Sequence, residues 1–198
     1  SKQKVMVGMS GGIDSSVTAY ILQKDGYEVE GVYLKLHNRT DGYHESNLSY
    51  IDGVTKFLGI KYHILDLSKK FKKDVYDYFV NSYIDGNTPN PCVKCNKNIK
   101  FGAMLDFAKK QGASFLATGH YVKTDGKFFY VADDLSKDQS YFLYTLNQQQ
   151  LAKSLFPLAD LKKPQVREIA RSLGFVTHDK KDSTGLCFIG ERKFKPFL

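Results

Sequence analysis

The sequence predicts a doubly wound α/β fold with a mostly parallel sheet. Short apolar segments typical of buried strands alternate with longer segments in which apolar residues recur at helical spacing. This alternation indicates parallel β-α-β units. A turn rich in glycine and serine joins the first expected strand to the first expected helix. No internal repeat or low-complexity segment interrupts the pattern.

Each element is expected from its local pattern. Strands are expected at residues 4–9, 28–36, 62–67 and 114–118, and helices at 12–24, 48–58, 68–84 and 164–173. Residues 85–96 hold two prolines and a glycine, so this segment is expected to start as an irregular loop, with a helix resuming near Asn98. Residues 121–132 predict a β-hairpin that turns at Asp125-Gly126.

The charge balance favours a polyanionic partner. The sequence has 29 Lys and Arg against 21 Asp and Glu, a net charge of +8, and the basic residues are spread along the chain. Such a balance suits nucleic acid, although a generic basic protein has the same composition. No segment approaches the ~20 apolar residues of a membrane helix, and the N-terminus lacks a signal-peptide core, so a cytoplasmic location without membrane contact is expected.

The turn after the first strand is typical of a phosphate-binding loop. It reads Met-Ser-Gly-Gly-Ile-Asp-Ser-Ser over residues 9–16. Glycines permit positive φ and close approach of a ligand, and free N–H groups at a helix start favour an anion. The Walker pattern is absent from the sequence. Gly119 and His120 follow the fourth strand, where the glycine leaves space for a nucleotide and the histidine suits either a structural or a functional role.

This string resembles the PP-loop of the N-type ATP pyrophosphatases, which split ATP between its α- and β-phosphates and transfer AMP to a substrate oxygen. The resemblance implies a PP-loop type of α/β fold, with ATP and Mg²⁺ as cofactors and Asp14 as a possible Mg²⁺ ligand. The implied ATP-binding residues are Gly8, Met9, Ser10, Gly11, Gly12, Ile13, Asp14, Ser15, Leu34 and Gly119.

Three further strings narrow the resemblance. They are Thr-Pro-Asn-Pro-Cys-Val-Lys-Cys-Asn (88–96), Lys-Asp-Gln-Ser-Tyr-Phe-Leu (137–143) and Asp-Ser-Thr-Gly-Leu-Cys-Phe-Ile-Gly-Glu-Arg (182–192). With the PP-loop, and in this order, they are similar to the tRNA-specific 2-thiouridylase family of MnmA type. That family is longer and carries β-rich domains that lie outside this sequence. We therefore expect one catalytic domain over 1–198, with residues 159–198 leading toward a tRNA-binding region.

The resemblance implies a two-step reaction. Adenylation of the uridine 2-oxygen creates a good leaving group, and sulfur then arrives as a persulfide from a sulfur-donor protein. By their places in the family motifs, Cys187 matches the sulfur carrier and Cys95 the second catalytic cysteine, which attacks the persulfide and leaves a Cys95–Cys187 disulfide. Thiolate character is needed, and Lys94 and Lys97 are expected to favour it.

One position departs from the family pattern. Where many members have an Asp credited with acid/base help, this sequence has Cys92. Cys92 then acts as a substitute acid or as an extra resolving thiol. Alternatively, Cys92, Cys95 and Cys187 are three ligands of an iron–sulfur cluster, and zinc is a weaker possibility. An odd number of cysteines in a protein expected in the cytoplasm argues against a structural disulfide framework.

The resemblance also assigns residues to tRNA. Asn90, Pro91 and Cys92 match the loop beside the target base, which must leave its stack to react. The match for a tRNA-contacting segment is Lys137, Asp138 and Gln139. Independently, Asp138 is expected to cap a helix N-terminus. Three other readings remain: a 2-thiocytidine synthetase with an iron–sulfur cluster, an amide-forming ligase, and a non-catalytic nucleotide-binding or sulfur-relay module.

Overall fold

The protein is built around one parallel sheet, seen here in a computed structural model that describes residues 1–175. The strand order is β3-β2-β1-β4-β7, and every neighbouring pair is parallel. The strands are β1 (Lys4–Gly8), β2 (Glu28–Lys35), β3 (Tyr62–Asp66), β4 (Phe115–Ala117) and β7 (Ser154–Leu155). The four predicted strands are confirmed, whereas β7 is too short to leave a pattern.

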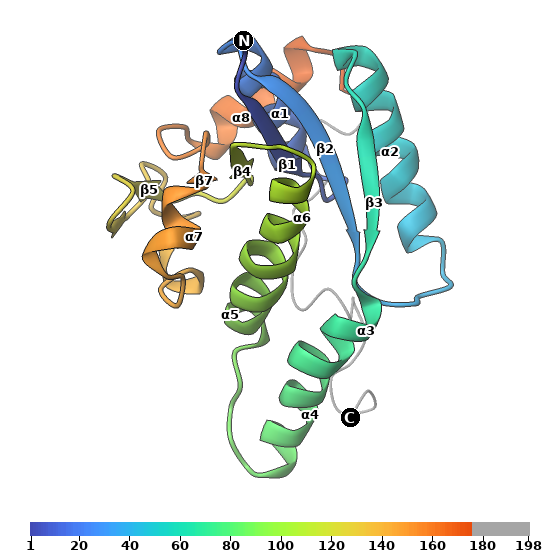
Figure 1. Ribbon diagram of the computed structural model, residues 1–198, viewed down its shortest axis with the longest axis vertical. Helices are drawn as coiled ribbons and strands as arrows, with labels where there is room; N and C mark the ends of the chain where they lie inside the picture. Colours follow the sequence, from blue (N-terminus) through green and yellow to red (C-terminus); the bar gives the residue numbers. More distant parts are fainter. Residues whose placement is uncertain (176–198) are drawn as a thin grey trace.

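Helices cover both faces of the sheet, as Figure 1 shows. On β1, Val5 and Val7 face the cluster built with α1, α2 and α8, while Met6 faces the cluster built with α6 and α7. The bounds are α1 (Ile13–Lys24), α2 (Tyr43–Leu58), α6 (Met104–Lys110), α7 (Gln148–Ala152) and α8 (Lys163–Ser172). Two apolar cores on opposite faces confirm the predicted doubly wound fold.

Two long helical segments extend from the carboxyl edge of the sheet, and each contains a π-helical stretch. The first runs through α3 (Ser68–Phe71), η1 (Lys72–Tyr76) and α4 (Asp77–Ile84), over the predicted residues. The second runs through α5 (Pro91–Cys95) and η2 (Asn96–Ala103) into α6. It begins seven residues before Asn98, so the predicted start is wrong. The Oδ1 of Asn90 accepts a hydrogen bond from the Val93 N–H (3.4 Å), and a proline at the first helical position suits a helix start.

The segment after β4 holds the remaining short elements. The predicted hairpin is confirmed as β5 (Lys123–Thr124) paired with β6 (Phe129–Tyr130). The predicted capping role of Asp138 is wrong, because the residue before the 3₁₀ helix η3 (Ser140–Phe142) is Gln139. The Asp138 carboxylate instead accepts hydrogen bonds from the Ala132 N–H (3.1 Å) and the Ser140 hydroxyl (2.7 Å).

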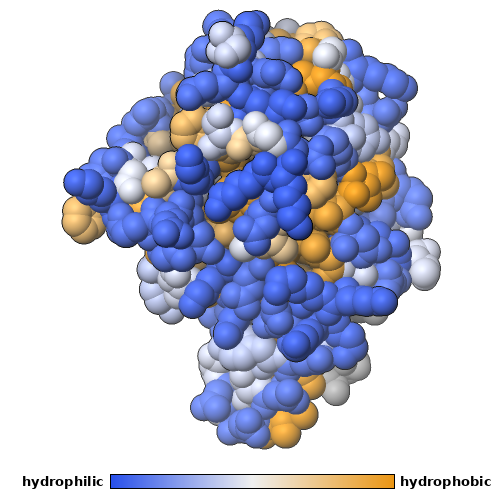
Figure 2. Space-filling view, viewed as in Figure 1, coloured by the Kyte–Doolittle hydropathy of each residue, from blue (hydrophilic) through white to orange (hydrophobic). Residues whose placement is uncertain are grey.

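The surface in Figure 2 is mainly hydrophilic, with apolar patches in separate places. Exposed apolar side chains include Ile64 on β3, Ile84 at the end of α4 and Phe128 in the hairpin. Within residues 1–175 no helix has both the length and the apolar character needed to cross a membrane.

A buried carboxylate on β2 connects the neighbouring strands β1 and β3 at one face of the sheet. Glu30 of β2 is 3% exposed and lies 2.9 Å from the Lys4 ammonium, 3.2 Å from that of Lys61 and 2.8 Å from His63 Nε2. Burial alone raises the pKa of Glu30, but hydrogen bonds from His63, Lys4 and Lys61 outweigh it and hold the pKa at about 2.

We expect Glu30→Gln to lower the free energy of unfolding by roughly 1.5–3 kcal/mol at pH 7, because it removes charge-assisted hydrogen bonds from a buried site. A carboxylate with a depressed pKa contributes stability above its unfolded value of 4.5 and loses that contribution as the pH falls toward about 2. Urea unfolding at pH 7 and pH 3 measures both effects. The control is Glu28→Gln, whose side chain is 56% exposed. Equal losses in the two variants at pH 7 would contradict the prediction.

Candidate active site

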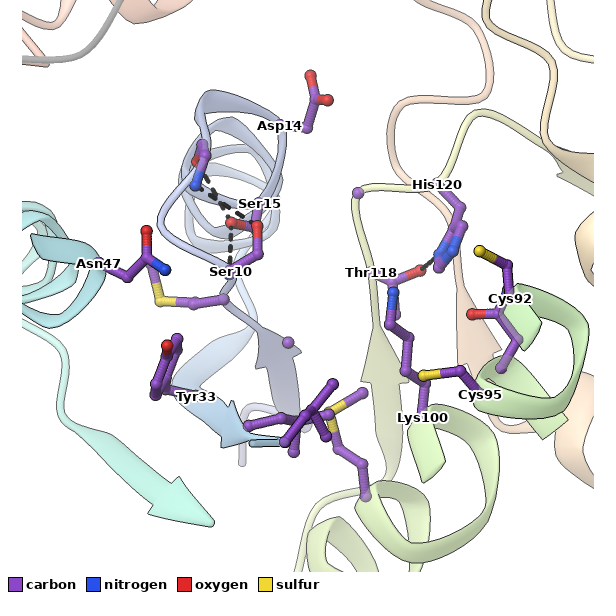
Figure 3. A pocket seen from close by; sticks show the side chains of 18 of the residues that line it. Ser10, Asp14, Ser15, Tyr33, Asn47, Cys92, Cys95, Lys100, Thr118 and His120 are labelled. Carbon is purple, nitrogen blue, oxygen red and sulfur yellow. Dashed lines mark hydrogen bonds between the residues drawn. The ribbon is translucent and has the colours of Figure 1, made fainter. Parts of the chain in front are cut away.

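The candidate site lies where the order of the strands reverses. The chain adds β2 and β3 on one side of β1 and then β4 on the other, so the loops after β1 and β4 diverge and leave a crevice. A cleft of about 820 Å³ opens there. Figure 3 shows Ser10, Asp14 and Ser15 on one side of it, and Cys92, Cys95 and Lys100 across from them.

The phosphate loop leaves backbone donors at the start of α1. Gly12 is the N-cap residue and has no side chain with which to cap the helix. The loop is held by its serines, because Ser15 Oγ accepts from the Ser10 N–H (3.2 Å) and Ser10 Oγ accepts from the Gly12 N–H (3.4 Å). Uncapped N–H groups and the helix dipole favour an anion at this position.

Most of the predicted nucleotide residues meet in this cleft. Those that line it are Gly8, Met9, Ser10, Gly12, Ile13, Asp14, Ser15, Leu34 and Gly119. Gly11 does not line it. Its φ is +85°, and a Cβ there would lie 2.6 Å from Asn47 Oδ1. The glycine therefore lets the loop pass close to Asn47 of α2, and its predicted contact with ATP stays a prediction.

Asp14 is held by two residues that sequence analysis missed. Lys163 Nζ donates to both carboxylate oxygens (2.8 and 2.9 Å), and the Tyr121 hydroxyl donates to Oδ1 (2.8 Å). Lys163 is 6% exposed and shares the buried face of α8 with Val166 and Ala170. The sequence did contain a signal for this contact. Lys163 precedes the apolar residues Val166 and Ala170 by three and seven positions, which places it on the same helix face, and a buried lysine needs an anionic partner.

Gly119 sets the distance between the two loops. A Cβ at this position would lie 3.0 Å from the carbonyl carbon and from the Cβ of Asp14, and 3.1 Å from the Ser15 nitrogen. The sequence suggested that this glycine makes space for a nucleotide. The structure adds a second requirement, because the loop after β4 packs directly against the first turn of α1.

The segment between β2 and α2 forms a third part of the cleft wall. His44 Nε2 donates to the His37 carbonyl (2.6 Å), because a carbonyl can only accept. In the neutral form of this ring, His44 Nδ1 accepts from the Tyr33 hydroxyl (2.6 Å). Burial, with smaller contributions from His44 and Arg39, lowers the pKa of His37 to about 4, so this ring is neutral at pH 7. Sequence patterns gave no sign of this arrangement.

The two cysteines stand on the opposite wall, one helical turn apart on α5. Both line the cleft, Cys95 being buried and Cys92 half-buried. Burial raises the pKa of the Cys92 thiol, and the positive charge of Lys100 offsets part of this rise. The expectation that Lys94 and Lys97 assist the thiols is not supported by their positions. Both are exposed and outside the cleft lining, whereas Lys100 lies in it.

Two further polar side chains line the cleft beside the cysteines. Asn96 donates from Nδ2 to the Phe142 carbonyl (3.4 Å), which fixes Oδ1 as an acceptor, and this buried Oδ1 has no hydrogen-bond donor within residues 1–175. His120 Nδ1 shares a 2.6 Å hydrogen bond with the Thr118 hydroxyl. Burial, and then Lys100, lowers the pKa of His120 well below its usual value, so the ring is neutral.

Some of the residues expected to contact tRNA line the cleft, whereas others hold the backbone segments around it. Pro91, Cys92, Lys137 and Gln139 line the cleft. Asn90 caps α5, and Asp138 holds the loop between β6 and η3. Gln139 also accepts a hydrogen bond from the Tyr121 N–H through Oε1 (3.2 Å), so it supports the loop between β4 and β5 that carries Tyr121.

Metal ligation by three side chains is not seen in the part of the chain that the structure describes, where no group of three His, Cys, Asp or Glu residues converges. The predicted cluster ligand and sulfur carrier Cys187 lies outside the described residues, so both the cluster and the Cys95–Cys187 pairing stay predictions. Asp14 offers the hard oxygen donors that Mg²⁺ prefers.

A parallel sheet with a glycine–serine loop at its switch point defines the class of PP-loop nucleotide-binding folds. The tRNA methyl transferase HUP domain family matches residues 3–191, and the chain therefore belongs to this family. Among its relatives is the tRNA-specific 2-thiouridylase MnmA 1 of Aliarcobacter butzleri, which is 65% identical over 96% of this chain and 56% of its own length. The 2-thiouridylase MnmA of Sulfurimonas denitrificans is 51% identical over 94% of this chain and 55% of its own length. The predicted resemblance is thus confirmed, and the chain spans about 55% of the length of such relatives.

Solved structures support the same fold at low sequence identity. The U34-tRNA thiolase NcsA of Methanococcus maripaludis, determined with its 4Fe–4S cluster, aligns with a TM-score of 0.58 at 20% identity. The alignment covers 94% of this chain and 60% of that one. At this identity the likeness establishes the fold alone.

We expect Gly119→Ala to destabilise the protein by about 1–3 kcal/mol, because the added methyl group meets backbone atoms of Asp14 and Ser15 that cannot easily move. The control is Gly53→Ala in α2, where an added Cβ meets no atom within 4 Å. This control should be neutral or stabilising by roughly 0.5–1 kcal/mol, as for a helical glycine replaced by alanine. Urea unfolding compares the two, and a neutral Gly119→Ala would show that the loops are not in close contact.

Proposed function

We propose that this chain is the nucleotide-binding, sulfur-transferring part of a tRNA 2-thiouridylase, an enzyme that replaces the 2-oxygen of a uridine with sulfur. The observation that carries the proposal is one cleft that joins a phosphate loop to two cysteine thiols. The family match and the names of the relatives support it. An amide-forming ligase has no need for the thiols.

The phosphate loop would bind ATP with its phosphates at the start of α1 and its adenine near Leu34 at the end of β2. The carboxylate of Asp14 and the hydroxyl-rich loop fit Mg²⁺, which is usually held by one or two carboxylates together with substrate phosphates. When bound, Mg²⁺ would neutralise part of the phosphate charge. Tyr121 orients Asp14 for this role through its hydroxyl.

In the first step the uridine 2-oxygen attacks the α-phosphorus of ATP. A bond forms between that oxygen and phosphorus, the bond to pyrophosphate breaks, and its electron pair leaves with pyrophosphate. The uridine must be turned out of its stack to reach the cleft, where Pro91 and Cys92 lie beside it. Within residues 1–175 the buried Asn96 Oδ1 has no hydrogen-bond donor, which supports a base with an N–H donor at this wall.

In the second step sulfur replaces the activated oxygen. A persulfide on Cys187, supplied by a sulfur-donor protein, is attacked by the Cys95 thiolate. A Cys95–Cys187 disulfide forms and hydrosulfide leaves. Hydrosulfide then adds to C2 and displaces AMP, after which an external thiol reduces the disulfide. The raised pKa of Cys92 keeps its thiol protonated, which supports the role of a substitute acid over that of a resolving thiolate.

The partners follow from the same proposal. A net charge of +8 suits contact with tRNA phosphates, and the position of Lys137 and Gln139 in the lining of the cleft supports a contact of these residues with RNA. Residues 159–198 would continue toward a tRNA-binding region in a longer enzyme. Such an enzyme acts where tRNA is modified, and we propose the cytoplasm.

We expect Asp14→Asn to reduce pyrophosphate release in the presence of tRNA by about 100-fold or more, because it removes the charged ligand for the cation and phosphates. Asn keeps an oxygen for Lys163 and Tyr121, whereas Ala would leave a buried ammonium without its anion. The control is Asp25→Asn, which is exposed at the other end of α1. Wild-type turnover by Asp14→Asn would show that the nucleotide site is assigned wrongly.

The cysteine variants separate the two steps. We expect Cys95→Ser and Cys187→Ser each to abolish thiolation while AMP formation continues, and Cys92→Ser to keep measurable activity that Cys92→Asp increases. Mass spectrometry of tRNA nucleosides, with an AMP assay in parallel, measures both steps. If instead all three serine variants fail alike and anaerobically prepared protein is brown and contains iron, an iron–sulfur cluster replaces the persulfide scheme.

A further inference from the structure

Lys163 is the one buried lysine within residues 1–175, and its ammonium lies inside the candidate site. It comes from the first residue of α8, far in sequence from the phosphate loop. Its own N–H donates to Asp134 Oδ2 (2.8 Å), which fixes the start of α8. Because the backbone is anchored, the side chain is aimed at a defined place, and movement of the ammonium requires only side-chain rotation.

The ammonium contacts both oxygens of Asp14, at 2.8 and 2.9 Å. Asp14 is also the carboxylate that fits a divalent cation. Mg²⁺ bound to oxygens at ~2.0–2.1 Å would lie close to the ammonium, and two cations that share one carboxylate repel each other. A cation on Asp14 therefore requires Lys163 Nζ to move away.

A second anion must then take over, because a buried ammonium without a partner is costly. Lys163 lines the same cleft as Ser10, Gly12 and Ser15, where phosphates would lie against the start of α1. Asp14 keeps a hydrogen-bond donor during the exchange, since the Tyr121 hydroxyl donates to Oδ1 from a different loop. The geometry thus provides each charged group with a partner before and after the exchange.

We propose that Lys163 is a catalytic residue that exchanges partners, pairing with Asp14 when no nucleotide is bound and with the phosphates of ATP when Asp14 holds the cation. This inference rests on the proposed nucleotide site. On the phosphates, the ammonium would stabilise the charge that develops on pyrophosphate as its bond to the α-phosphorus breaks, without transferring a proton. A purely structural ion pair between α1 and α8 would show no such exchange.

The exchange predicts changes of opposite sign for two ligands. In Lys163→Met, Asp14 loses its competing cation, so Mn²⁺ should bind more tightly in the absence of nucleotide, by roughly tenfold or more. The same variant lacks the phosphate contact, so α,β-methylene-ATP with Mg²⁺ should bind more weakly, by roughly tenfold or more. Electron paramagnetic resonance of Mn²⁺ and equilibrium dialysis of the analogue measure these affinities in the whole protein.

Matched variants complete the test. Lys163→Arg keeps the charge, so both affinities should stay near wild type. Lys162→Met changes the neighbouring exposed lysine and should alter neither. If Lys163→Met does not fold, as judged by its thermal transition, Lys163→Gln enters the same two titrations. Affinities that both fall, or that both stay unchanged, overturn the exchange while leaving the nucleotide site in place. An analogue that fails to bind wild-type protein overturns both the exchange and the proposed function.

Discussion

The close contact between the loop after β4 and the first turn of α1 is the constraint on which the site depends. A side chain at position 119 would meet Asp14 and Ser15 at about 3 Å, so only glycine lets the two loops touch. Because they touch, the Tyr121 hydroxyl can reach Asp14. Thr118 and His120 of the same loop region share a hydrogen bond and line the cleft that also contains the cysteines. Because β1 and β4 are parallel neighbours, the loops that follow them leave the sheet at the same edge. Gly119 then allows the two loops to approach each other closely.

The site is completed by a segment far away in sequence. The β1–α1 unit provides a loop, uncapped N–H groups and one carboxylate, but its charge is balanced by Lys163 from α8. The burial of α8 against α1 through Val166 and Ala170 is therefore also what places the ammonium. The packing of α8 thus both stabilises the domain and holds Lys163 at the cleft.

The fold could be predicted well where a strand is buried on both faces of the sheet and is therefore apolar throughout, as at Val5, Met6 and Val7 of β1. Sequence analysis failed where one residue type occurs in two kinds of local structure, as proline does in loops and at helix starts. The prolines near Cys92 indicated a loop, but Asn90 and Pro91 start a helix, and this difference places Cys92 and Cys95 one turn apart on one wall. Contacts such as Lys163 with Asp14, or His44 between Tyr33 and His37, depend on tertiary placement that local periodicity does not encode. For Cys187, the motif alone supplies the assignment.

The two walls of the cleft offer the opposite environments that a two-step reaction needs. The α1 wall presents backbone N–H groups, a carboxylate and an ammonium, which suit a polyphosphate and the charge that leaves with it. The α5 wall is buried, so it raises the pKa of Cys92 and keeps His120 neutral, and Lys100 limits the rise at Cys92. In the proposed reaction, an oxygen activated at the first wall would face the thiols of the second wall within the same cleft. A single cleft of about 820 Å³ contains both walls, and this is the physical reason for proposing that both steps take place at one site.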